Sequence, residues 1–104
     1  MPIHDQVSMG IYRHYKGQLY QVIGIAHDAN DENRTCVVYI GLQLDAAHLG
    51  PRMAVRDLED FLAYVDPKTG NTNVDWMTPM YPRFDYMGMY LEEWMIQDAQ
   101  KESH

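Results

Sequence analysis

No segment limits the possible folds of this chain more than residues 35–42, which read Thr-Cys-Val-Val-Tyr-Ile-Gly-Leu. The run has the length of a strand and is apolar at nearly every position, so both of its faces are expected to be covered. It contains the single cysteine, Cys36, which cannot form an internal disulfide. A chain of 104 residues must therefore rest on one apolar core, with this strand inside the sheet.

The neighbouring segments favour strands joined by tight turns. Residues 11–26 are rich in β-branched and aromatic side chains, and Gly17 supplies a reversal near their middle, which predicts a hairpin. The polar stretch 28–34 predicts a second hairpin loop, which leads into the central strand. Residues 53–56 predict a further short strand.

The rest of the chain predicts a helical turn, an edge strand and a C-terminal helix. Asp57 is expected to cap a helical turn over residues 58–61. Residues 82–86 read as an edge strand, because a proline cannot donate to a central ladder. Apolar residues then recur along one helix face, which predicts an amphipathic helix. These residues are Met87, Tyr90, Leu91, Trp94 and Met95.

Five short strands, with one helical turn before the last, favour a mainly β fold: a small SH3-like antiparallel barrel with a C-terminal amphipathic helix. A ferredoxin-like sandwich is the alternative, but it needs two long helices between strands, for which the middle of the chain has no room. We expect an N-terminal stub over residues 1–9, a barrel domain over residues 10–86 with a longer loop at 66–81, and a helix and tail over residues 87–104.

Charge and hydropathy exclude several classes of function. The chain has 8 basic and 15 acidic residues, a net charge of −7. Residues 1–52 carry four basic and five acidic side chains, whereas residues 53–104 carry four and ten. Because nucleic-acid affinity comes largely from Lys and Arg on phosphates, we expect no nucleic-acid partner. No apolar run approaches the roughly 18 residues of a membrane span, and the N-terminal residues lack a signal-peptide pattern, so we expect a cytoplasmic protein without membrane contact.

Several short motifs lie between residues 10 and 86. The segment 10–17 reads Gly-Ile-Tyr-Arg-His-Tyr-Lys-Gly and is followed by Tyr20-x-Val22 and Ala26-His27. Further along come Val37-Val38-Tyr39, Val55-Arg56, Phe61 and Pro82-Arg83-Phe84. Together they resemble a family of small, mostly bacterial proteins known as domain of unknown function 1653 (DUF1653).

The resemblance implies an SH3-like barrel and implies no assigned activity. This sequence departs from the family pattern at residues 52–57, where a tryptophan before Val55-Arg56 and a proline after it are missing. The segment between Val65 and Pro82 is longer than usual, and the helix after Tyr86 is an extension.

Cationic and aromatic side chains alternate along the first predicted strand, which sends Tyr12 and His14 to one face and Arg13 to the other. One interpretation is that the arginines brace neighbouring strands, since a guanidinium offers five donors in a fixed fork. The other is that they converge as a cationic, aromatic-rimmed pocket for a carboxylate or phosphate. The candidate ligand-binding residues are Tyr12, Arg13, His14, Lys16, His27, Tyr39, Arg56 and Arg83.

The histidines raise two further kinds of chemistry. His14 and His27, with Asp28, could hold a divalent metal, but their spacing is not that of a compact ligand motif, and we expect no metal and no cofactor. General acid–base use of His14 is open. No serine or cysteine at a readable spacing from a histidine suggests a nucleophile, and the catalytic residues stay unassigned.

The last third of the chain is rich in methionine and aromatic residues. The C-terminal helix either folds back over an open end of the barrel or presents a surface that docks a partner segment or a second subunit. The two interpretations are compatible if the helix is exchanged between the subunits of a homodimer. The candidate interface residues are Trp76, Met80, Tyr90, Leu91, Trp94 and Met95.

Two classes of function follow from these patterns. The first is a non-enzymatic binding or interaction module with a protein or peptide partner. Its groove would be edged by Tyr12, His14, Tyr39, Arg56 and Arg83. The alternative is an enzyme or small-molecule-binding protein that acts on an anionic ligand, with His14 or His27 as acid–base. A site at which His14 meets at least two arginines would favour an anionic ligand.

Overall fold

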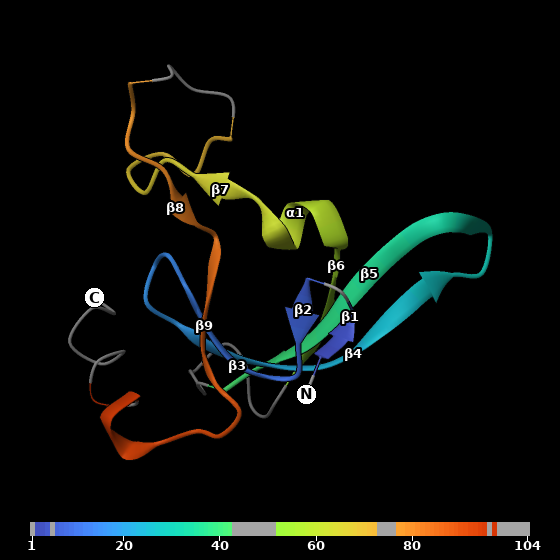
Figure 1. The fold of residues 1–104 in the computed structure, drawn as a ribbon, viewed down its shortest axis with the longest axis horizontal. Helices are drawn as coiled ribbons and strands as arrows, with labels where there is room; N and C mark the ends of the chain where they lie inside the picture. The colour runs from blue at the N-terminus through green and yellow to red at the C-terminus, as the bar shows by residue number, and fades with distance from the viewer. Residues whose placement is uncertain (1, 5, 43–51, 73–76, 96, 98–104) are drawn as a thin grey trace.

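The described chain forms three antiparallel sheets and a short helix after the sixth strand (Figure 1). The computed structural model describes residues 2–4, 6–42, 52–72, 77–95 and 97. In chain order the elements are β1 (Pro2–His4), β2 (Val7–Ser8), β3 (Gly10–His14), β4 (Leu19–Asp28), β5 (Asp31–Gly41), β6 (Met53–Asp57), α1 (Leu58–Leu62), β7 (Tyr64–Val65), β8 (Tyr81–Pro82) and β9 (Phe84–Gly88). The fold is therefore mainly β, as predicted.

The main sheet has the strand order β6-β5-β4-β3-β9 and is not closed into a barrel. The predicted interior position of residues 35–42 is confirmed, because β5 pairs with β4 on one side and β6 on the other. Closure fails at the seam between β6 and β9. The chain leaves β6 directly into α1, and the next strand, β7, pairs with β8 in a separate two-stranded sheet.

Two hairpins build most of the main sheet. The β3–β4 turn is formed as predicted, and Gly17 adopts a φ of 103°, which is open to glycine at little cost. The second hairpin differs from the prediction of a loop over residues 28–34, because β4 extends to Asp28 and β5 begins at Asp31. Residues 31–34 are exposed, so a strand there buries none of their polar side chains.

The core lies between one face of the main sheet and α1. Phe61 of α1 stacks on Phe84 of β9, with ring centroids 4.4 Å apart and an interplanar angle of 9°. The core cluster also contains Val7, from the segment predicted as an N-terminal stub, which instead forms β1 and β2. Its buried members are Val7, Tyr12, Val22, Val37, Tyr39, Phe61 and Phe84.

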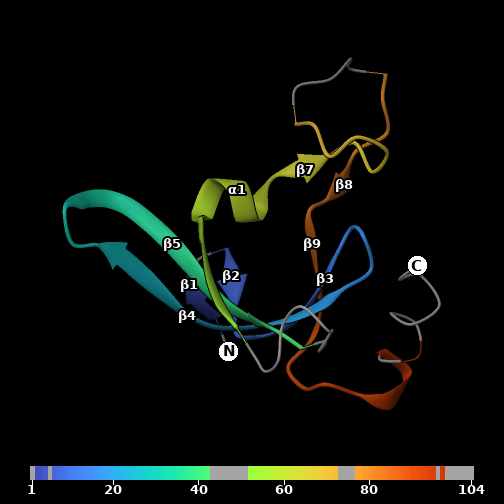
Figure 2. The same ribbon diagram turned by 180° about the vertical axis from the view of Figure 1, so that it is seen from behind.

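The opposite face of the sheet carries a smaller cluster of Ile11, Leu19 and Met95. Figures 1 and 2 show α1, β7 and β8 on one side of the main sheet and the segment after β9 on the other. The predicted start of the C-terminal helix at Met87 is wrong, because Met87 lies within β9. The described backbone is helical at residues 93–95 and 97, and most of the predicted tail lies outside the described residues.

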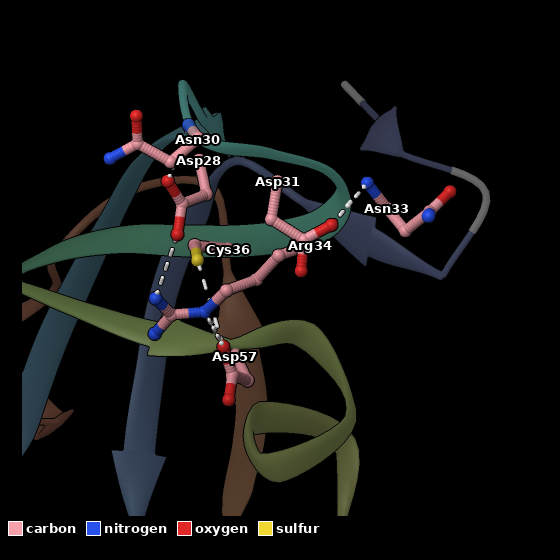
Figure 3. A network of polar contacts seen from close by, with 7 residues as sticks. All are labelled: Asp28, Asn30, Asp31, Asn33, Arg34, Cys36 and Asp57. Carbon is pink, nitrogen blue, oxygen red and sulfur yellow. Dashed lines mark hydrogen bonds and ion pairs between the residues drawn. The ribbon is translucent and has the colours of Figure 1, made fainter.

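The predicted capping role of Asp57 is also not observed. Asp57 precedes α1, but its side chain makes no capping hydrogen bond. Its carboxylate instead accepts a hydrogen bond from Arg34 Nε at 2.6 Å, while Arg34 Nη1 reaches Asp28 at 3.2 Å (Figure 3). Arg34 thus links the β4–β5 hairpin to the end of β6 through solvent-exposed ion pairs.

Candidate functional site

His14 lies at the end of β3, opposite Phe84 of β9. The alternation of β3 places Tyr12 and His14 on the core face, and the tight turn after His14 leaves its ring half-buried. Its centroid is 5.1 Å from the Phe84 ring and 6.2 Å from the Tyr20 ring, both in edge-on geometry. Aromatic side chains therefore form the floor beneath this histidine.

Arg56 reaches the same floor from the edge strand β6. Its Nε donates a hydrogen bond to the Tyr39 hydroxyl at 3.1 Å, and its guanidinium lies 5.6 Å from the centre of the Phe84 ring. The second contact has the geometry of a cation–π interaction. We call His14, Tyr20, Tyr39, Arg56 and Phe84 the His14 cluster.

The His14 cluster carries an excess of positive charge. Burial lowers the pKa of His14 from 6.5 to about 4, with further lowering by the charges of Arg56, Lys16 and Arg83. The imidazole is therefore neutral at pH 7. Its Nδ1 accepts a hydrogen bond from the Lys16 backbone N–H at 3.2 Å, so the remaining hydrogen is on Nε2. His14 is thus set up to donate from Nε2.

This pKa predicts that the protein loses stability on acidification between pH 6.5 and 4. In that window the unfolded chain binds a proton at His14 that the folded chain does not, so stability rises with pH and levels off above 6.5. The full shift corresponds to about 3 kcal/mol, and because half of the ring faces solvent we expect about 1–2 kcal/mol. Urea denaturation of the wild-type protein and of His14→Gln at several pH values measures this loss of unfolding free energy.

In the folded protein, NMR titration of the His14 ring should give a midpoint near 4. A midpoint close to that of an ordinary histidine, or an identical pH dependence of stability in His14→Gln, would contradict this prediction.

A hollow of about 280 Å³ lies beside His14. Arg13, Tyr15 and Asp85 contribute to its lining. Arg13 stands opposite Asp85 in the β3–β9 register, where side chains of opposite charge are close neighbours. This register supports the bracing interpretation for Arg13, which stays a prediction.

The structure separates other predicted site residues from the His14 cluster. His27 pairs with Thr35, eight strand positions beyond Leu19, which pairs with Arg13 beside His14. At about 3.3 Å per residue this is a separation of roughly 26 Å, too far for a shared metal. In the described part of the chain, no group of three or more potential ligands could hold a metal ion.

Tyr12, another predicted ligand-binding residue, is buried, and its hydroxyl donates a hydrogen bond to the Ser8 carbonyl at 3.0 Å.

The candidate interface residues differ in their surroundings. Met95 is buried within this chain against Ile11 and Leu19, and Met80 is half-buried. Tyr90, Leu91 and Trp94 are exposed, with Tyr90 at 77%. Trp76 lies outside the described residues.

Two members of the His14 cluster were absent from the predicted site. In the sequence, Tyr20 and Phe84 stand out only as parts of the DUF1653 motifs. Strand alternation could have indicated Tyr20, because the register pairs it with Tyr12, whose side chain shares the core face with that of His14. Nothing local indicates Phe84, since its place beneath Arg56 depends on which strands become neighbours.

Comparisons with known proteins agree with the sequence motifs. The family model described as a protein of unknown function (DUF1653) matches residues 10–86, the range over which the motifs resemble that family. A crystal structure of a DUF1653 protein from Bordetella bronchiseptica is 32% identical, with a TM-score of 0.62, and the match covers 85% of this chain and 96% of that chain. No curated protein matches the chain. No helix in the described residues has the length and hydropathy that a bilayer crossing requires.

Proposed function

We propose that the chain, which belongs to the DUF1653 family, is a non-enzymatic binding module whose His14 cluster receives an anionic group of its ligand, a carboxylate or a phosphate. An SH3-like arrangement, open at one seam, is part of this proposal. The consecutive antiparallel pairing of β3, β4, β5 and β6 supports it.

One observation carries the proposal: positive charges gather around a neutral hydrogen-bond donor in a chain that is acidic as a whole. Arg56, Lys16 and Arg83 all lie close enough to His14 to lower its pKa, although the chain holds only 8 basic residues against 15 acidic ones. Within the described part of the chain, Arg56 contacts a tyrosine hydroxyl and an aromatic ring and forms no ion pair with a carboxylate. Its positive charge is therefore available to an anion.

The state of His14 favours binding over acid–base catalysis. A general base works best with a pKa near the operating pH, and the pKa of His14 lies near 4. Its Nδ1 lone pair is already occupied by the Lys16 N–H, which leaves Nε2 as a donor. A neutral donor that shares the Phe84 ring with the Arg56 guanidinium suits an anion that is held rather than transformed.

The test is an NMR titration of the protein with inorganic phosphate and, separately, with citrate at constant ionic strength. Both probes should shift the His14 resonances. Because a hydrogen bond to a charged group contributes about 1.5–3 kcal/mol, Arg56→Gln should weaken the better probe about tenfold or more. Arg52→Gln removes the same charge four residues away, where the side chain is exposed, and should change the affinity less than about twofold.

A second variant separates loss of the charge from loss of packing. Tyr39→Phe removes the hydroxyl that Arg56 binds but keeps the guanidinium, so most of the affinity should remain. Equal weakening by Arg56→Gln and Arg52→Gln would show that general charge attraction alone holds the probe. Absence of any His14 shift with both probes would overturn the proposed anion site.

A further inference from the structure

A second hollow, of about 320 Å³, lies between the α1–β7 segment and β9. It is bordered by α1 and β7 on one side and by β9 on the other; Figure 1 shows α1 and β7 above the main sheet, of which β9 is an edge strand. We call it the aromatic hollow, because five of its lining residues carry aromatic rings. These are Tyr12, Phe61, Tyr64, Phe84 and Tyr86.

The rings divide into a buried floor and two exposed walls. Phe61 and Phe84 stack on each other in the core. Tyr64 of β7 and Tyr86 of β9 are 58% and 43% exposed, so both side chains are accessible to a ligand. Tyr86 is held in place by the Tyr12 ring at 5.1 Å and by a hydrogen bond from its hydroxyl to the Met9 carbonyl at 3.4 Å. The hollow is thus walled by tyrosines from two different elements.

The charge of the aromatic hollow has one sign. Among the described residues that line it, Asp85 is the only acidic one and none is basic. Asp85 stands opposite Arg13 in register, so the tyrosine faces must supply most of any attraction for a cation. The net charge of −7 adds a long-range field that favours cations. An uncharged ligand would gain nothing from the negative ring faces or from the long-range field.

We propose that the aromatic hollow binds an alkylammonium group, with the faces of Tyr64 and Tyr86 as its walls. The negative face of an aromatic ring attracts such a cation, and quaternary ammonium groups are recognised in this way by clusters of rings. This site differs from the His14 cluster in its walls and in the sign of its ligand. The two share only Phe84, whose ring contributes to both floors.

The experiment compares a cation with its uncharged isostere. Choline and 3,3-dimethylbutan-1-ol have the same shape, so titrating each against the protein at fixed ionic strength, with the tyrosine ring resonances as the readout, isolates the contribution of the charge. Choline should shift the Tyr64 and Tyr86 resonances and bind at least about fivefold more tightly than the alcohol.

Two tyrosine variants form a matched pair. Tyr64→Ala removes one wall, and its exposure makes misfolding a small concern. We expect about a threefold or greater loss of choline affinity. Tyr81→Ala removes a tyrosine of similar exposure, 54%, from the neighbouring strand β8, but Tyr81 does not line the aromatic hollow and its loss should leave the affinity unchanged.

The source of the ammonium group is distinguished by a third probe, capped trimethyllysine. Tighter binding of this amino acid than of choline supports a protein side chain as the natural ligand, and the reverse supports a free small molecule. Equal binding of choline and the alcohol would overturn the proposal, as would equal losses in Tyr64→Ala and Tyr81→Ala. Because neither tyrosine belongs to the His14 cluster, phosphate and citrate binding should survive Tyr64→Ala, which separates this proposal from the proposed function.

Discussion

Replacing Phe61 by alanine should lower the free energy of unfolding by about 3–5 kcal/mol, the usual cost of removing a buried phenylalanine ring. Phe61 is only 2% exposed, stacks on Phe84 and meets the edge of the Tyr12 ring at 5.2 Å. It is the buried residue of α1, and the partly buried Leu58 and Leu62 pack against the same core. A domain of this size has about 5–15 kcal/mol of stability in total, so the variant should be close to unfolding at physiological temperature.

Urea denaturation of Phe61→Ala and Phe61→Leu measures this effect. Leucine keeps much of the apolar volume, so Phe61→Leu should cost about 1–2 kcal/mol. Met53→Ala on β6 is the surface control, because Met53 is 66% exposed and its truncation should change stability by less than about 0.5 kcal/mol. A loss below about 1.5 kcal/mol in Phe61→Ala would mean that α1 contributes little to the core.

The strands could be predicted where local chemistry decides them. The apolar run that contains Val37 and Tyr39 predicts an interior strand from its own composition. Gly17 favours a tight turn, and the strands before and after that turn can pair with each other. Closure of the sheet depends instead on where the chain goes after Asp57. No local pattern shows that α1 carries it away from the seam before a strand long enough to pair with β9 begins.

The candidate site was predictable to the same extent. Strand alternation correctly places Tyr12 and His14 on one face. The chemistry of the guanidinium group, in turn, indicates arginine as the partner for an anion. It cannot show that Arg56 crosses from an edge strand to Tyr39 and Phe84, because that contact follows from the β5–β6 and β3–β9 registers. The walls of the aromatic hollow were missed for the same reason. Tyr64 and Tyr86 line the same hollow because β8, which pairs with β7, is followed directly by β9.

Gly10 offers the sharpest test of how β3 and β9 come together. Its φ is +140°, in a region that side chains with a Cβ rarely adopt. A Cβ at this position would lie 2.5 Å from the Gly88 carbonyl oxygen and 3.1 Å from the Met89 Cα, both of which are backbone atoms. Rotating a side chain cannot relieve such contacts, so the strands would have to separate. Gly10→Ala should therefore cost about 2–4 kcal/mol.

Gly24→Ala is the matched control, because Gly24 also lies in the main sheet but its added Cβ would meet nothing within 4 Å. That variant should be neutral or stabilising by up to about 1 kcal/mol, since alanine reduces the freedom of the unfolded chain. Denaturant unfolding of both variants gives the difference. Hydrogen exchange locates it: amides of β9 should lose protection in Gly10→Ala, whereas those between β4 and β5 should keep it. Equal stability of the two variants would show that β9 shifts readily against β3, and that the aromatic hollow, whose lining includes Tyr12 of β3 and Tyr86 of β9, is correspondingly adaptable.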